Sequence, residues 1–179
     1  VANAASFDWG LLALLNRKLF FLDARLSAEV VHAGEFDLSG MLAMLKAKKD
    51  ELGASWIVFD GVDVLLTLLR DPAGEMREMY RIRDWLAENG MTALITAKTE
   101  GGHSEVVNYD FMQFMVDCVV GLSRRMEHAV SLHRLQLTKY RGSDFMAGDF
   151  PVSFGPGGLQ VAPPEPAEIR HAASTERLS

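Results

Sequence analysis

Cysteine is almost absent from this sequence, since Cys118 is the only one among 179 residues. A single thiol excludes an intrachain disulfide and a cluster of thiolate metal ligands. Cys118 lies in an apolar run, so we expect a buried, unreactive thiol and a reducing, cytoplasmic setting. Long apolar runs are also missing, because no stretch approaches the roughly 20 residues that cross a bilayer. We therefore expect no membrane partner.

Basic residues are also fewer than acidic ones. Lysine and arginine number 18 against 24 acidic residues, which gives a formal net charge of −6. This balance argues against broad electrostatic binding to nucleic acid. The five histidines show no metal-ligand spacing, so the sequence gives no reason to expect a zinc site.

Apolar strands and amphipathic helices alternate through the first half of the chain. Ser6 is the expected N-cap of the first helix, and Gly53 and Gly90 are the expected stops of the next two. In the third helix we expect five side chains to face inward: Met76, Met79, Tyr80, Ile82 and Leu86. We predict helices at residues 7–15, 38–52 and 72–89, and strands at residues 19–23, 56–60 and 91–96.

These strands are continuously apolar, which is typical of a parallel sheet buried on both faces. After residue 115 the pattern alternates, which predicts one antiparallel hairpin from strands 117–125 and 129–140 and another from strands 150–154 and 159–161. The expected fold class is therefore α/β, with a mostly parallel sheet followed by C-terminal antiparallel strands.

Asp60 ends the apolar segment W-I-V-F-D-G and is the first candidate site residue. Ligands of open parallel sheets bind beyond the carboxyl ends of the strands. A carboxylate there suits a hydrated Mg²⁺, as in a Walker B strand. An aspartate that merely caps a loop explains the same pattern.

Lys139 and Arg141 lie two residues apart near the end of a predicted strand, so both side chains leave the same face. Gly142 follows and can turn the backbone. Two cations projected together suit a polyanion such as a triphosphate. A solvated strand face is the alternative.

Together these residues resemble the KaiC-type branch of RecA-like ATPases from about residue 3 to 161. The stretch with the most specific pattern is L-x-K-Y-R-G-S-x-F-M-x-G-D-F-P at the end of this region. Other matching stretches are A-x-S-F-D-W, L-F-F-L-D-A, F-D-L-S-G-M-L, W-I-V-F-D-G and R-x-M-Y-R-I-R-D-W-L.

The resemblance implies a three-layer RecA-like P-loop NTPase core that assembles as a homohexamer with Mg²⁺ and ATP between subunits. It makes Asp60 the Walker B aspartate, which holds Mg²⁺ through water. It implies that Lys139 and Arg141 act in trans on the γ-phosphate of the neighbouring subunit, with Tyr140 and Ser143 close to the nucleotide.

Several features of the family pattern are missing. No G-x-x-x-x-G-K-[ST] occurs in the 179 residues, and the paired catalytic glutamates are absent. Gly61 stands where the family usually has serine or threonine, Lys98 where it often has glutamate, and Phe145 where it usually has histidine.

We therefore expect a partial domain: residues 1–161 as the C-terminal part of one ATPase domain, and residues 162–179 as a linker or tail that leads to a second. The expected function is ATP hydrolysis in clock-like or signalling regulation, with clock or signalling proteins as partners and with autophosphorylation left open. A RecA relative in DNA recombination or repair and a non-catalytic interaction module are the alternatives.

Overall fold

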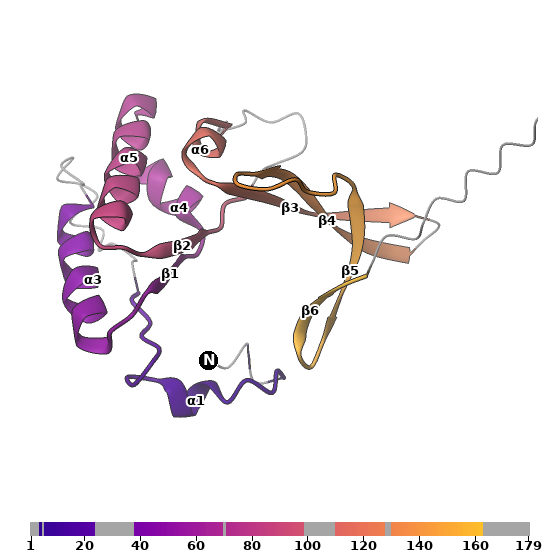
Figure 1. Ribbon diagram of the computed structural model, residues 1–179, viewed down its shortest axis with the longest axis horizontal. Helices are drawn as coiled ribbons and strands as arrows, with labels where there is room; N and C mark the ends of the chain where they lie inside the picture. The colour runs from indigo at the N-terminus through magenta and orange to yellow at the C-terminus, as the bar shows by residue number, and fades with distance from the viewer. Residues whose placement is uncertain are drawn as a thin grey trace, which may run out of the picture. The chain divides into compact units, whose positions relative to one another are not determined.

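The computed structural model describes residues 4, 6–23, 38–69, 71–98, 110–127 and 130–162 (Figure 1). Two compact units divide these residues. One contains residues 9–117, and the other contains residues 118–162 together with residues 6–8.

The first unit is built around two parallel strands, β1 (Trp56–Phe59) and β2 (Thr92–Ile95). Their register pairs Trp56 with Thr92 and Phe59 with Ile95, so both strands end at the same edge. The helical elements of this unit are α1 (Leu11–Leu14), α3 (Ser39–Leu52), α4 (Val62–Leu66), the 3-10 helix η2 (Thr67–Leu69), α5 (Pro72–Glu88) and α6 (Asp110–Met115).

The core of this unit lies between the helices and one face of the β1–β2 sheet. Ile57, Phe59 and Ile95 pack into it from the strands, while Met79 and Ile82 enter it from α5. Its buried members are Leu38, Leu42, Phe59, Val62, Leu66, Met79, Ile82 and Met112. Leu38 and Leu42 at α3, and Met79 and Ile82 in α5, recur at helical spacing, which is why the sequence pattern located both helices.

Helices α3 and α5 begin and end close to the predicted positions. The Asp71 carboxylate caps α5 by accepting hydrogen bonds from the N–H groups of Ala73 and Gly74 at 3.1 and 3.0 Å. Gly53 ends α3 in the left-handed region with φ of 62°, a conformation that favours glycine. The pKa of Glu75 in the first turn of α5 is raised, mainly by burial and further by the Asp71 carboxylate.

Glu78 is the buried charged residue that joins α5 to the start of α3. Its side chain is almost fully enclosed, and Oε2 accepts a hydrogen bond from the Leu38 N–H at 3.2 Å. Oε2 also lies 3.5 Å from Nε of Arg81, whose guanidinium donates to the Ser39 hydroxyl. Leu38 precedes α3 without a side-chain cap, so Glu78 supplies negative charge at the positive end of that helix.

Residues 19–23 are not the predicted strand. Leu19 makes an isolated parallel bridge to Leu15, and the Phe21 side chain is 58% exposed. Nζ of Lys48 on α3 lies 5.1 Å from the centre of the Phe20 ring. An apolar run becomes a strand when a neighbouring strand pairs with its backbone, and no described strand lies alongside this one.

Burial was predicted less well than secondary structure. Trp56 and Val58 are 70% and 59% exposed, so the β1–β2 sheet is buried on one face within this unit and not on both. Met76 and Tyr80 are also exposed, because they lie to the side of the α5 stripe that meets the core. The predicted N-cap was wrong too: α1 begins at Leu11 after Gly10, and not after Ser6.

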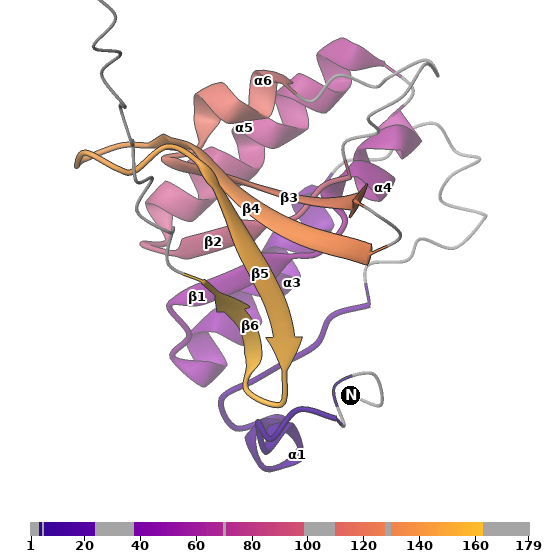
Figure 2. The same cartoon turned by 90° about the vertical axis from the view of Figure 1, so that its right-hand side faces the viewer.

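The second unit is a four-stranded antiparallel sheet in the order β3–β4–β5–β6 (Figure 2). Its strands are β3 (Cys118–Glu127), β4 (Val130–Tyr140), β5 (Asp149–Gly155) and β6 (Gly158–Val161). Both predicted hairpins are confirmed. Cys118 is exposed, so the expectation of a buried thiol was wrong. It is the first residue of β3 and pairs with Tyr140, the last residue of β4, at the open end of the hairpin.

Replacing Glu78 with alanine should destabilise the protein by about 2–3 kcal/mol. The substitution leaves the Leu38 N–H without its acceptor and removes the carboxylate beside Arg81. Asp84→Ala is the control on the same helix, since its ion pair with Arg83 is exposed and should change stability by no more than about 0.5 kcal/mol. Urea unfolding measures both, and equal losses in the two variants would contradict the role given to Glu78.

Candidate functional site at the end of the parallel strands

Asp60 directly follows β1, at the edge of the sheet where both parallel strands end. Gly61 then turns the chain into α4 with φ of 72°, in the left-handed region. The Asp60 carboxylate is exposed. The predicted position of this carboxylate, at the tip of a strand, is confirmed.

Thr96, the residue after β2, holds the Asp60 turn through its hydroxyl. This oxygen accepts a hydrogen bond from the Gly61 N–H at 2.8 Å and donates one to Oδ1 of Asp60 at 2.6 Å. The second distance is in the range of a hydrogen bond from a hydroxyl to an ionised carboxylate. One side chain therefore fixes both the turn and the carboxylate.

The Thr96 backbone holds the residues on either side of Asp60. Its N–H donates to the Phe59 carbonyl at 2.9 Å, and its carbonyl accepts from the Val62 N–H at 2.9 Å. Thr96 thus contacts four consecutive residues across the end of the sheet. Thr96 was not among the predicted site residues, although a hydroxyl at the carboxyl end of a predicted parallel strand was a usable signal.

The donors at this edge suit a hydrated magnesium ion. A carboxylate and a hydroxyl are hard oxygen ligands, which Mg²⁺ prefers, and Mg²⁺ commonly binds proteins through one or two carboxylates while keeping several waters. Within the described ranges no group of three His, Cys, Asp or Glu side chains could hold a metal by itself. A magnesium ion at Asp60 would therefore need further ligands from phosphate oxygens and water.

The cationic residues predicted from the sequence lie in the second unit, at the end of β4. Lys139 is half-buried on the strand, Tyr140 is its last residue, and Arg141 follows it with an exposed side chain. Gly142 has φ of 107°, so the backbone does turn there as predicted. The hydroxyl of Ser143 donates to the Asp144 carbonyl at 3.2 Å. Lys139, Tyr140, Arg141 and Ser143 are near neighbours along the chain. Their role toward a nucleotide stays a prediction.

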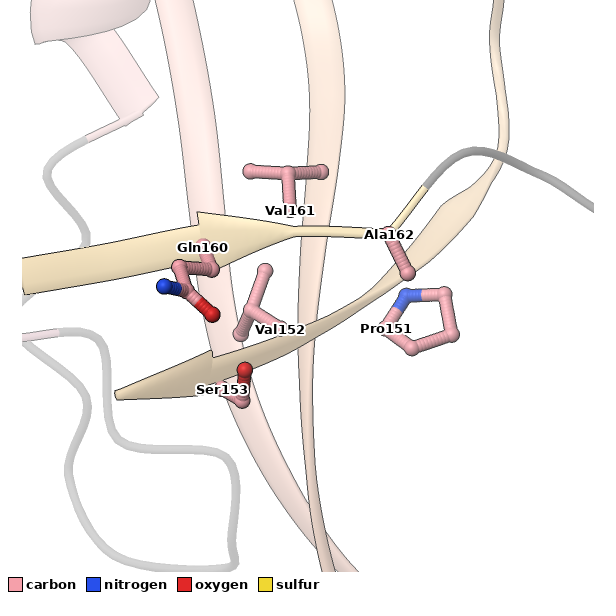
Figure 3. Close-up of a pocket in the computed structure, with 6 residues that line it drawn as sticks. All are labelled: Pro151, Val152, Ser153, Gln160, Val161 and Ala162. Atoms are coloured by element: carbon pink, nitrogen blue, oxygen red, sulfur yellow. The ribbon is translucent and has the colours of Figure 1, made fainter. Parts of the chain in front are cut away.

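A cavity of about 270 Å³ lies against the β5–β6 hairpin (Figure 3). It contains none of the predicted site residues and presents no charged side chain. Its lining residues are Pro151, Val152, Ser153, Gln160, Val161 and Ala162. The polar side chains of this lining are Ser153 and Gln160, so it offers neither a carboxylate for a metal ion nor a cation for a polyphosphate. None of the described helices combines the length and apolar character needed to cross a membrane.

The model of the KaiC ATPase family matches residues 1–166. This chain belongs to the KaiC ATPase family. The resemblance drawn from the sequence motifs is thereby confirmed.

The chain is similar to circadian clock proteins. The chain is 28% identical over 181 residues to the circadian clock protein KaiC2 of Synechocystis sp., covering all of this chain and 32% of the relative. It is 28% identical over 182 residues to the circadian clock oscillator protein KaiC of Parathermosynechococcus lividus, and 30% identical over 188 residues to that of Prochlorococcus marinus subsp. pastoris. Both alignments cover all of this chain, and 34% and 36% of the relatives. The chain thus spans about a third of the length of the curated relatives it matches.

Replacing Gly61 with alanine should cost about 1 kcal/mol or more, because a side chain disfavours the left-handed backbone at φ of 72°. Gly40→Ala is the matched control. Gly40 lies within α3, and nothing lies within 4 Å of the Cβ that the substitution adds. Alanine there should leave stability unchanged or raise it by about 0.5–1 kcal/mol. Denaturant unfolding compares them, and a stable Gly61→Ala variant would show that the turn can adopt another conformation.

Proposed function

We propose that this chain supplies the Walker B aspartate and the trans-acting cations of an ATPase that hydrolyses Mg·ATP between subunits. The observation that carries the proposal is the Asp60 carboxylate, fixed at the carboxyl end of two parallel strands by Thr96. Membership of the KaiC ATPase family supports ATP as the nucleotide.

The proposed architecture is a RecA-like three-layer core, of which the β1–β2 pair with α3 and α5 forms part. The division into an ATPase portion at residues 1–161 and a linker at residues 162–179 remains a prediction, and residues 163–179 lie outside the described residues. The P-loop that cradles the phosphates would come from sequence outside residues 1–179, because no such motif occurs within them.

In the proposed site, each of the two neighbouring subunits contributes different residues. Asp60 would hold a magnesium ion through a water molecule, and this ion would supply positive charge to neutralise the phosphates of the nucleotide. From the neighbouring subunit, Lys139 and Arg141 stabilise the charge that develops on the γ-phosphate during transfer. Tyr140 and Ser143 lie beside these cations in sequence and would border the nucleotide.

Assembly follows from this division, because a site completed by a neighbour needs a repeated head-to-tail interface, which forms a ring if the rotation between subunits closes and an open filament if it does not. We propose a homohexamer. The names of the curated relatives favour a role in circadian or clock-like regulation. A second candidate is a non-catalytic interaction module that keeps the fold, which the missing Walker A motif would favour if residues 1–179 were the whole gene product.

The rate of Mg·ATP hydrolysis should depend on both Lys139 and Arg141. In the complete gene product that carries residues 1–179, Arg141→Ala should lower kcat by about 10³-fold, the lower end of the range for an arginine that acts across an interface. Lys139→Ala should lower it as well. Arg125→Ala, which removes an exposed cation of the same sheet, is the control and should leave turnover unchanged.

The same preparations, sized with and without Mg·ATP, separate the alternatives. ATP-dependent hexamers with impaired turnover in both variants support the proposal. Assembly without ATP, together with no turnover, favours the interaction module. Stimulation of turnover by DNA would point to a recombination or repair ATPase.

Mixing two inactive variants should restore activity if Arg141 acts in trans. A subunit with Asp60→Asn still presents Arg141, and a subunit with Arg141→Ala still has its own Asp60. Random mixing in equal amounts places an intact pair at about a quarter of the interfaces, so turnover should return to about a quarter of the unmodified level. Mixtures as inactive as their components would show that both residues serve the same subunit's site.

A further inference from the structure

The hydroxyl of Thr96 has a fixed direction in its hydrogen bonds. A backbone N–H can only donate, so the hydroxyl oxygen must accept from Gly61 and its single proton is directed at Oδ1 of Asp60. The Thr96 hydroxyl thus accepts a hydrogen bond from the turn and donates one to the carboxylate.

We propose that Thr96 is a positioning residue for Asp60, which sets the rotation of the carboxylate that receives the magnesium-bound water. This inference rests on the proposed function of Asp60 and extends it to a residue on the neighbouring strand. The Thr96 hydroxyl engages Oδ1 at 2.6 Å, so Oδ2 keeps its full acceptor capacity and would be the oxygen available to a metal-bound water.

The backbone contacts make this positioning precise. Thr96 donates to the Phe59 carbonyl and accepts from the Val62 N–H, each at 2.9 Å, so its main chain is tied to both sides of the turn. The hydroxyl therefore approaches the carboxylate from a fixed point. An exposed aspartate without such a partner samples several rotamers, and each misplaced rotamer lowers the fraction of protein ready to bind the ion.

A role limited to capping the turn would be different. The hydrogen bond to Gly61 alone would stabilise the start of α4, and its loss would change stability without changing the response to magnesium. The bond to Asp60 predicts a change in the magnesium dependence itself.

The test compares Thr96→Val with Thr96→Ser in the complete gene product. Valine has nearly the same shape without the hydroxyl, whereas serine keeps the hydroxyl. We expect Thr96→Val to raise the magnesium concentration for half-maximal turnover about tenfold and to lower kcat, with KM for ATP changed less. Thr96→Ser should stay within about twofold of the unmodified protein. Thr92→Val, at the exposed start of the same strand, should change nothing.

Hydrogen exchange of the peptide that contains Gly61 gives a readout without nucleotide or turnover. Its amide should exchange faster in Thr96→Val and at the unmodified rate in Thr96→Ser. Unchanged exchange in Thr96→Val would overturn the hydrogen-bond assignment. Unchanged magnesium dependence in that variant, or a serine variant that behaves like valine, would overturn the positioning role.

Asp60→Asn separates failure of this inference from failure of the proposed function. If Asp60→Asn abolishes turnover while Thr96→Val has the normal magnesium dependence, Asp60 keeps its role and only the positioning by Thr96 is wrong. If Asp60→Asn retains full turnover, or the gene product hydrolyses no ATP, the proposed function fails and the magnesium role of Thr96 fails with it.

Discussion

Thr96 holds the end of the parallel sheet by bonding to four consecutive residues, from the Phe59 carbonyl to the Val62 N–H. Strand pairing brings Thr96 to this place, because the register that sets Phe59 opposite Ile95 leaves Thr96 beside the turn. A one-residue slip would turn each side chain to the opposite face and would remove the hydroxyl from Asp60. The position of the carboxylate therefore depends on the register of β1 and β2.

Helices α3 and α5 and the two hairpins were predictable because their signals are local. Asp71 before Pro72 and Gly53 after α3 mark helix ends through contacts with their own backbone neighbours. Burial was not predictable in the same way. The exposure of Trp56 and of Cys118 depends on which elements cover a face, and an apolar run carries no information about that.

The site was predictable to a similar extent. Asp60 was located because a carboxylate at the tip of an apolar strand is a pattern within one segment. Thr96 is 36 residues away along the chain, and its hydroxyl becomes relevant only when the two strands pair. Glu78, whose bond to the Leu38 N–H spans 40 residues, was missed for the same reason. Contacts between distant residues require the tertiary structure.

The glycine after Asp60 can be understood from the same contacts. Gly61, which departs from the serine or threonine that the family resemblance implies at this position, adopts φ of 72°. A left-handed turn at this point is easiest for glycine, because a side chain there would strain the backbone. The hydroxyl beside the carboxylate then comes from the neighbouring strand, since Thr96 donates to Asp60 while accepting from the Gly61 N–H. Asp60 therefore still accepts a hydrogen bond from an uncharged hydroxyl, although residue 61 has none.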